Sequence, residues 1–519
     1  MSETIPIPVK LRRLCVVLGD QLDHGSVIFD GFDPAQDALL ITEAAEEASY
    51  IAQHKKRLVL FFSAMRHFAE DQRAEGRPVI YRRLDDPEPA ESLADSLRRA
   101  VGAHSPDEIL LVKPGDWRVL DALRGASAEL DTPLRVCADT HFLTTDQEFH
   151  EWFDGRKRVV LEDFYRVGRK RTGWLMDEGQ PEGGAWNFDK DNRKSFGKQG
   201  PGLLPGRADF EPDALTAEVI KMVGARFSNA PGKLDGFQEP VSRQNALRAL
   251  DDFITHRLPQ FGDYQDAMAT GELTLYHSRI SAVMNLKLLR PEECCLAAIE
   301  ALREGRAPLN AVEGFIRQIL GWREFIRGVY WALMPEYAER NHLEAGADVP
   351  GFFWTGETEM ACLADGVGGL VETGYAHHIQ RLMVMGLFLM LYGARPYAVH
   401  QWHIAMYLDA IDWVSLPNVL GMSQHGDGGV VGTKPYSASG AYIDRMSDSC
   451  ARCPHDPKQA TGSKACPFTT LYWDFLDRHE DRFKGNMRMK MQLNNLVRKS
   501  DDDRRAIRGA AEKLKARLA

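Results

Sequence analysis

The chain has 519 residues, which is long enough for two or more domains. Its formal net charge of −10 disfavours a protein that binds nucleic acids through an overall positive charge. Hydrophobic residues make up 44% and charged residues 27%, as in ordinary soluble globular proteins. The longest apolar run, LMVMGLFLML at 382–391, is about half of the ~20 residues that a membrane span needs, so it predicts a buried helix. The opening MSETIPIPVKLRR has no charged-then-apolar leader, and we expect a cytoplasmic protein.

The first 140 residues alternate between short apolar runs and helical patterns, which predicts a Rossmann-like α/β domain with a parallel sheet. The runs interpreted as buried strands are LCVVLGD (14–20), RLVLFF (57–62), PVIYRR (78–83), EILLVKP (108–114) and LRVCAD (134–139). The stretch AMRHFAEDQRAEG (64–76) is typical of an intervening helix. No G-x-G-x-x-G follows the first strand, so the pattern does not predict a dinucleotide-binding fingerprint.

Polar residues follow two of the apolar runs in this domain. Asp20 and Gln21 come just after the first predicted strand, and Thr42, Glu43 and Glu47 come after the run ALLI. Ligands of parallel sheets bind beyond the carboxyl ends of the strands, so we expect a pocket near these side chains. The alternative is that GDQLD simply ends a strand.

Residues 141–240 are polar and rich in Gly, Pro and Asp, which predicts a long interdomain linker on the surface. The linker contains GRKRVVLEDFYRVGRKRTG (155–173), with seven Arg or Lys residues. A charge run is most often a solvated face, whereas the interleaved Phe164, Tyr165 and Trp174 favour a segment that is docked or faces DNA.

From about residue 241 to 519 the pattern is helical almost throughout, which predicts a large all-helical domain. Apolar residues recur at helical spacing in NAVEGFIRQILGWREFIRGVYWALMP (310–335), and strand signals are nearly absent. The expected architecture is therefore an α/β domain (1–140), a linker (141–240) and an all-α domain (241–519).

Three of the eight cysteines lie in the stretch CARCPHDPKQATGSKACPF. Cys450 and Cys453 form a C-x2-C pair and Cys466 follows, a spacing that suits structural zinc, an iron–sulfur cluster or free thiols. His455 could complete a zinc site, and a disulfide framework would need an oxidising compartment. The spacing alone does not identify a fourth cysteine ligand among Cys15, Cys137, Cys294, Cys295 and Cys362.

Several stretches of the helical half resemble the photolyase/cryptochrome family. GWREFIRGVYW (321–331) is similar to its W-R-E-F helix, and HSRIS (277–281) to its T-S-R-L-S flavin-phosphate motif, with histidine in place of threonine. HHIQRLMV (377–384) resembles its His-x-x-x-Arg helix, and the stretch from YLDAIDWV to GDGG (407–429) lies where the family has its Asp-rich flavin loop. LGDQL, EEASY, FSAMRHFA, LEDFYR, GMSQ and KPY further resemble the iron–sulfur bacterial cryptochromes and photolyases, also called prokaryotic (6-4) photolyases.

This resemblance implies two resident cofactors in the helical domain. The branch carries a [4Fe–4S] cluster on four cysteines, which here match Cys362, Cys450, Cys453 and Cys466. The family binds FAD, folded into a U, whose reduced form passes one electron to a pyrimidine dimer when it absorbs light. The residues expected at the FAD are Tyr264, His277, Ser278, Ser281, Gln318, Arg323, Arg381 and Asp409.

Two of these assignments make local structural predictions. Ser278 and Ser281 are expected on one helix face, at i and i+3, facing the diphosphate. Arg323 is expected at the flavin or its phosphate, and the alternative is an internal ion pair with Glu324.

A (6-4) lesion must leave the duplex to reach such a flavin, so base flipping is implied. Its repair needs an electron and a proton shuttle, for which histidine is suited because its pKa is near neutral. His377 and His378 match the family's active-site histidines, although adjacent histidines can also simply cap a helix. Met422, Tyr436 and Tyr442 match the branch's lesion pocket, whose rings would stack on bases.

The resemblance also implies an electron route and a light-harvesting antenna. Trp402 and Trp354 match the electron route, with a histidine following Trp402 where the branch often has a tyrosine. Asp20, Thr42 and Glu47 match a pocket for 6,7-dimethyl-8-ribityllumazine, and of these Thr42 departs from the usual residue.

The function implied is light-driven repair of (6-4) photoproducts by a monomer that binds UV-damaged DNA and no membrane. The basic segments 155–173 and 482–499 are the expected DNA contacts, although the second is equally typical of an amphipathic terminal helix. The alternatives are a blue-light photoreceptor, which signals through the flavin redox state, and a flavin-free binding protein. HSRIS and WREF disfavour the flavin-free protein, and the retained His377, His378 and Tyr436 favour repair over signalling.

Overall fold

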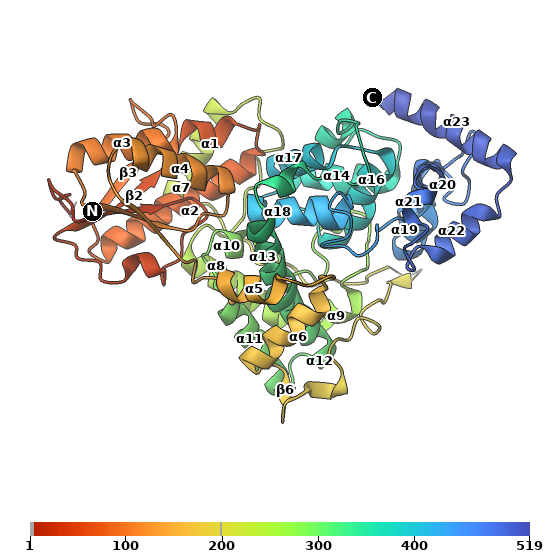
Figure 1. Ribbon diagram of the computed structural model, residues 1–519, viewed down its shortest axis with the longest axis horizontal. Coiled ribbons are helices and arrows are strands. Elements are labelled where there is room, and N and C mark those ends of the chain that lie inside the picture. Colours follow the sequence, from red (N-terminus) through yellow and green to blue (C-terminus); the bar gives the residue numbers. More distant parts are fainter. Residues whose placement is uncertain (1–4, 198–199, 519) are drawn as a thin grey trace.

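A parallel five-stranded sheet forms the centre of the N-terminal domain in the computed structural model, which describes residues 5–197 and 200–518. The strands lie in the order β3-β2-β1-β4-β5, with Arg13 opposite Asp37 on one side and Glu108 on the other. Their bounds are β1 Arg13–Val17, β2 Asp37–Thr42, β3 Val79–Arg82, β4 Glu108–Val112 and β5 Leu134–Cys137. The predicted α/β class is confirmed, and this domain lies at one end of the molecule (Figure 1).

One predicted strand is wrong. RLVLFF (57–62) lies inside helix α2 (Lys55–Ala74), and the missing strand is β2, formed by DALLIT. His54 caps the start of α2, because its Nδ1 accepts a hydrogen bond from the Lys56 amide at 3.1 Å. Most of α2 is buried, so its apolar residues run together at this point and conceal the helical period.

The remaining helices of this domain surround the sheet. They are η1 (Val27–Phe29), α1 (Ala45–Ser49), α3 (Leu93–His104) and α4 (Trp117–Glu129). Side chains of Ser92 and Asp116 cap α3 and α4, which fixes where the loops beyond β3 and β4 end.

The connector that follows is more ordered than its composition predicts. Helix α5 (Asp146–Phe153) lies beside α13 (Glu324–Leu333), as Figure 1 shows, and α6 (Leu161–Thr172) packs on η4 (Arg317–Arg323). Phe149, Trp152 and Phe164 pack in the same core cluster as Phe325. The connector also contains the pair β6 (Met176–Asp177) and β7 (Gln180–Pro181), then η2 (Glu182–Gly184) and α7 (Ala214–Arg226). Aromatic residues thus fix the first part of the connector to the helical core.

Residues 241–518 form helices without a β-strand, as the sequence predicts. The first helices are α8 (Arg243–His256), α9 (Leu258–Tyr264), α10 (Ser281–Asn285), α11 (Pro291–Arg303), α12 (Leu309–Ile316), η4 (Arg317–Arg323), α13 (Glu324–Leu333), η5 (Glu336–Glu339), η6 (Gly351–Trp354) and α14 (Ala361–Thr373). Next are α15 (His378–Gln380), η7 (Arg381–Gly386), α16 (Leu387–Tyr392), α17 (Pro396–Met406), α18 (Asp412–Pro417), η8 (Asn418–Ser423) and α19 (Gly440–Met446). The last are η9 (Ser449–Arg452), α20 (Pro467–Arg478), α21 (Glu480–Phe483), α22 (Lys490–Val497) and α23 (Asp501–Leu518).

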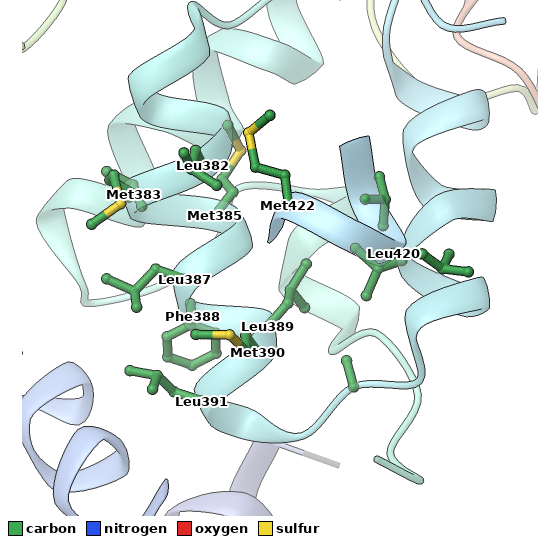
Figure 2. Packing of buried hydrophobic residues seen from close by; sticks show 14 of the residues in the cluster. Leu382, Met383, Met385, Leu387, Phe388, Leu389, Met390, Leu391, Leu420 and Met422 are labelled. Carbon is green, nitrogen blue, oxygen red and sulfur yellow. The ribbon is translucent and has the colours of Figure 1, made fainter. Parts of the chain in front are cut away.

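The apolar run 382–391 forms a buried helix at the centre of this half, as predicted (Figure 2). Its first turn, η7, packs on η8 so closely that a Cβ on Gly386 would lie 2.2 Å from Ser423 Oγ. Both η7 and η8 are π-helical, a form that often occurs at functional sites. In the part of the chain that the structure describes, no helix is long and apolar enough to cross a bilayer.

Candidate flavin and lesion site in the helical half

An ion pair that is mostly buried joins three of the predicted residues. Arg381 Nη1 donates to Asp409 Oδ1 at 2.9 Å, and Ser281 Oγ donates to Asp409 Oδ2 at 2.6 Å. Burial alone would raise the pKa of Asp409, but the Arg381 charge and these two hydrogen bonds lower it overall. Asn285 adds a hydrogen bond of 2.8 Å to the Asp409 carbonyl, so α10, η7 and the loop before α18 meet at this carboxylate.

The predicted helix face shared by Ser278 and Ser281 is wrong. Helix α10 begins only at Ser281, and Ser278 lies in the preceding loop. Arg279 between them has a φ of +61°, a left-handed conformation that interrupts a right-handed helix. The Arg279 guanidinium instead covers the Tyr375 ring at 3.8 Å and donates to Glu239 at 2.6 Å.

Two of the predicted histidines stack on one another beside this network. The rings of His277 and His377 lie 4.7 Å apart and are nearly parallel, at 7°. Both are buried, and His277 Nε2 and both ring nitrogens of His377 have no hydrogen-bond partner. Burial lowers the pKa of His277 to about 3 and that of His377 well below its ordinary value. Both rings are therefore neutral at pH 7.

His378 differs from its neighbour because its side chain is open to solvent. The surrounding protein still desolvates the ring enough to lower its pKa to about 4, with a further contribution from the Arg381 charge. His378 is therefore the predicted active-site residue that a ligand could reach directly. We call the region formed by His277, His377, His378 and the Arg381–Asp409 pair the recess.

Aromatic residues extend the recess away from the histidines. Tyr264 stacks on Tyr276 at 5.6 Å and on Phe196 at 4.8 Å, and Tyr276 directly precedes His277. Tyr276 and Phe196 were not predicted, because tyrosine and phenylalanine in a loop carry no distinctive sequence signal.

The three predicted lesion-pocket residues differ in their burial. Tyr436 and Tyr442 are half-buried, and burial followed by the Asp266 charge raises the pKa of Tyr442 to about 12. Burial also raises the pKa of Asp266 itself to about 6. Met422 is buried on η8 beside Leu382 and Met385 (Figure 2).

Gln318 and Arg323 lie on η4, outside the Asp409 network. Gln318 is half-buried and donates to its own helix, to the Gly314 carbonyl at 3.2 Å. Arg323 packs over the rings of Phe142 and Trp413 at 4.2 and 4.9 Å. The structure thus supports the alternative for Arg323, a buried contact of 3.5 Å with Glu324, and gives no contact with the Asp409 network.

The residues in this recess fit a polar, flat cofactor. The buried atoms without a partner include His277 Nε2, both His377 nitrogens, Gln380 Oε1 and His403 Nε2. Buried polar atoms in folded proteins are nearly always hydrogen-bonded, so this group calls for a ligand with donors and acceptors. The Arg381 guanidinium supplies the positive charge that a diphosphate requires.

A line of aromatic rings connects this network to the surface. Arg381 covers the Tyr407 ring at 4.2 Å, and Tyr407 lies 5.7 Å from the buried Trp402. Trp402 Nε1 donates to the Phe353 carbonyl at 3.0 Å, and the next residue, Trp354, is 36% exposed. Trp402 is thus in contact with Tyr407, the ring that sequence reasoning missed, and Trp354 follows the residue that Trp402 contacts.

All four predicted cluster cysteines line one small cavity. Cys362 comes from α14, and Cys450, Cys453 and Cys466 come from the segment between α19 and α20. None forms a disulfide. Over residues 5–197 and 200–518, no set of three or more His, Cys, Asp or Glu side chains is arranged to hold a single metal ion.

The predicted antenna residues meet in a second cavity, of about 130 Å³, at the carboxyl ends of β1, β2 and β4. Asp20, Thr42 and Glu47 all line it, together with Arg57 and with Asp412 from the helical half. The cavity therefore lies between the two domains, where the topology of a parallel sheet predicts a ligand.

Most polar groups of this second cavity are already paired. Glu47 accepts two hydrogen bonds from Arg118, at 2.9 and 2.8 Å, and Thr42 Oγ1 lies 2.6 Å from Ser96 Oγ. Burial, followed by repulsion from Asp412, raises the pKa of Asp116 to about 7.

The two basic segments differ in what they face. In α6, Phe164 and Tyr165 are buried, and the buried Arg169 donates to the carbonyls of Trp174 and Trp186 at 3.3 and 3.1 Å. The structure therefore favours the docked alternative for 155–173. In 482–499, by contrast, most of the cations are exposed.

The parallel-sheet α/β domain followed by a large helical domain is the architecture of the photolyase/cryptochrome class. Residues 15–238 match the family model described as deoxyribodipyrimidine photo-lyase-related protein. The chain is 46% identical to the (6-4) photolyase of Agrobacterium fabrum over 502 residues, which covers 96% of this chain and 98% of that protein. An uncharacterised protein of Acanthamoeba polyphaga mimivirus is 29% identical over 120 residues, 23% of this chain and 90% of its own length.

Solved structures have the same fold. A bacterial class III photolyase from Agrobacterium tumefaciens aligns with a TM-score of 0.56 at 15% identity, over 86% of this chain and 88% of that one. A Synechocystis cryptochrome aligns with a TM-score of 0.51 at 11% identity, over 80% and 83%. The chain belongs to the photolyase/cryptochrome family, on the branch that contains the Agrobacterium (6-4) photolyase, and this membership implies FAD as its cofactor.

Proposed function

We propose that this protein is a (6-4) photolyase, which uses light to repair (6-4) photoproducts in DNA. Bound FAD supplies the photochemistry and the electron. The observation that carries the proposal is the accessible His378 beside the unpartnered His377, in a recess closed by the Arg381–Asp409 pair. The 46% identity to a (6-4) photolyase supports the choice of lesion.

The two histidines have the chemistry that the repair needs. Both rings are neutral at pH 7, and a neutral imidazole has one N–H donor and one acceptor nitrogen with which to contact the lesion and relay a proton. His378 is the ring open to solvent, so we assign it the direct contact with the flipped lesion. His377 is buried and would orient its neighbour or contact the cofactor.

The cofactor is assigned to the network around Asp409. Ser281 and Arg381 would hold the diphosphate or the polar edge of the ring, and Tyr264 would pack on the adenine end. His277 and His403 would each direct an unpartnered nitrogen toward the bound group. Ser278 and Gln318 are assigned only to the periphery.

We assign the cysteine cavity to a [4Fe–4S] cluster. Cys362, Cys450, Cys453 and Cys466 all line one cavity and none is in a disulfide. Four cysteine thiolates are the ligand set of a [4Fe–4S] cluster, which supports the assignment. The cluster would also stabilise the fold, since it joins α14 to the segment before α20.

We assign the second cavity to the antenna 6,7-dimethyl-8-ribityllumazine. Asp20, Thr42 and Glu47 supply oxygen acceptors for ring amides and ribityl hydroxyls. The cavity lies against Ile404 and Ile411 of the helical half, so excitation would reach the flavin over a short distance.

A second candidate function is blue-light signalling through the flavin redox state. The aromatic path through Trp402 to the surface favours it, because such a path refills a flavin with electrons whether or not DNA is repaired. The accessible His378 favours repair, because signalling has no need of a reachable proton carrier.

The test is illumination of the purified protein with an oligonucleotide that carries one (6-4) lesion, with restored thymines as the readout. We expect repair in blue light only, and no repair of a cyclobutane dimer in parallel. His378→Ala should abolish repair while FAD stays bound, and the control His256→Ala, an exposed histidine on α8, should behave as wild type. Unaltered repair by His378→Ala would remove its role, and a light-induced redox change without repair would favour the photoreceptor.

A further inference from the structure

Two methionines are among the most exposed hydrophobic side chains of the described chain. Met487 is 78% exposed and Met491 is 74% exposed, whereas Met489 between them is fully buried. The buried Met489 anchors the backbone between them. Met487 lies in the turn between α21 and α22, and Met491 lies in the first turn of α22. We call Met487 and Met491 the methionine ridge.

Hydrogen bonds attach the ridge to the segment that carries Tyr436. Asn486 donates to the Thr433 carbonyl at 3.2 Å, and Arg488 donates to Thr433 Oγ1 at 2.8 Å. Gln492 donates to the Ser437 carbonyl at 3.2 Å. The ridge is therefore held beside Tyr436, one of the residues expected in the lesion pocket.

Cations alternate with the methionines. Arg488 and Lys490 are exposed, and Lys434 is half-exposed on the adjoining segment. Among the salt bridges of the described residues none involves these three, so their charges are free for a partner. Apolar tips between unpaired cations match a nucleic acid, whose phosphates flank an apolar stack of bases.

We propose that the methionine ridge enters the gap that a flipped lesion leaves in the duplex, while Arg488 and Lys490 hold the flanking phosphates. The inference rests on the proposed function, because it needs a lesion extruded toward Tyr436. Apolar wedges, methionine included, stabilise unstacked base steps in other DNA-binding proteins. The unbranched methionine side chain adapts to an irregular gap, and two side chains are too small an area for a stable protein interface.

If the ridge fills the gap, its removal should lower the affinity for duplex DNA more than the affinity for single-stranded DNA, since only a duplex has a gap to fill. We compare wild type, the double variant Met487→Ser/Met491→Ser and the control Val497→Ser, a residue 64% exposed on the same helix. The probes are a (6-4) oligonucleotide, free or annealed to a strand with 2-aminopurine opposite the lesion. We expect the double variant to weaken duplex binding about tenfold and to change single-strand binding less than about twofold, because filling the gap offsets the unstacking cost.

Two further readouts separate the wedge from charge and from folding. The 2-aminopurine fluorescence should rise with wild type and with Val497→Ser, and stay low with the double variant. Arg488→Gln should weaken binding to both DNA forms and reduce the slope of log affinity against log salt by about 1.

Equal duplex affinity of wild type and the double variant, or equal losses on both DNA forms, would overturn the inference. So would unaltered DNA binding together with a lower sedimentation mass, since the ridge would then contact a second copy. Failure of the proposed function is a separate result: wild type would then leave even the single-stranded lesion unrepaired in light.

Discussion

The cavity at the sheet edge and the recess in the helical half differ in how far their polar groups are already paired. In the cavity, Glu47 binds Arg118 and Thr42 contacts Ser96. In the recess, buried nitrogens of the stacked histidines 277 and 377 have no partner.

The difference indicates which of the two ligands contributes to the stability of the fold. An unpaired buried polar group costs about 1–3 kcal/mol, and several occur together in the recess. A ligand that satisfies them stabilises the folded helical half, whereas the cavity at the sheet edge is stable without its ligand. We therefore expect changes in the helical half to have large effects on folding and changes at the sheet edge to have small ones.

The largest effect is expected at the cysteine cavity. Cys453→Ala should lose the iron and leave little soluble protein, because the cluster contributes to folding. Cys137→Ala, which removes a half-buried thiol of β5, is the matched control and should keep about four iron atoms per chain. Iron and zinc analysis of the purified proteins checks this, and wild type with one zinc and no iron would refute the cluster.

The next effect is expected at Asp409. Asp409→Ala leaves the Arg381 charge unpaired and should lower the free energy of unfolding by about 3–5 kcal/mol. The purified Asp409→Ala protein should also contain little FAD. The control Asp263→Ala breaks a more exposed pair with Lys194 and should cost about 1 kcal/mol or less. Denaturant unfolding with flavin absorbance measures both, and equal behaviour of the two variants would contradict the proposed site.

A moderate effect is expected from pH. Burial, followed by the Arg381 charge, lowers the pKa of His403 to about 3, while the ordinary value is 6.5. Below pH 6.5 the unfolded chain takes up a proton that the folded chain refuses, so stability falls on acidification. Between pH 6.5 and 5.5 His403 should contribute a loss of about 1 kcal/mol. His403→Gln should reduce the pH dependence by that amount, and identical slopes would show that His403 is not buried as described.

The smallest effect is expected at the sheet edge. Glu47→Gln weakens one half-exposed pair with Arg118 and should change stability by less than about 1 kcal/mol. It should lower the affinity for an added ribityllumazine while FAD content and repair in saturating light stay normal. A loss of FAD in this variant would reverse the comparison between the two sites.

The fold could be predicted from the sequence where short-range patterns decide it. Alternating apolar runs gave β1, β3, β4 and β5, and helical spacing gave residues 241–518. The pattern failed at 57–62 because α2 is buried on most sides, and a helix without a polar face has no visible period.

The site was less accessible to local reasoning. Cys362 lies far from Cys450 in the chain, so only the family resemblance joined them before the tertiary structure did. The prediction that Ser278 and Ser281 share a helix face failed because Arg279 between them has a positive φ. Positive φ can be expected from the sequence at Gly, Asn or Asp, but not at an arginine. Tyr407 was missed because a buried tyrosine is ordinarily part of the core.

The most direct measurement is the flavin content of the purified protein. The unpartnered nitrogens of the recess call for a bound ring system, so we expect about one FAD per chain. The FAD released by denaturation is measured by its absorbance, separately from the iron–sulfur absorption. A well-folded chain that carries no flavin, and takes up none when FAD is added, would contradict the account.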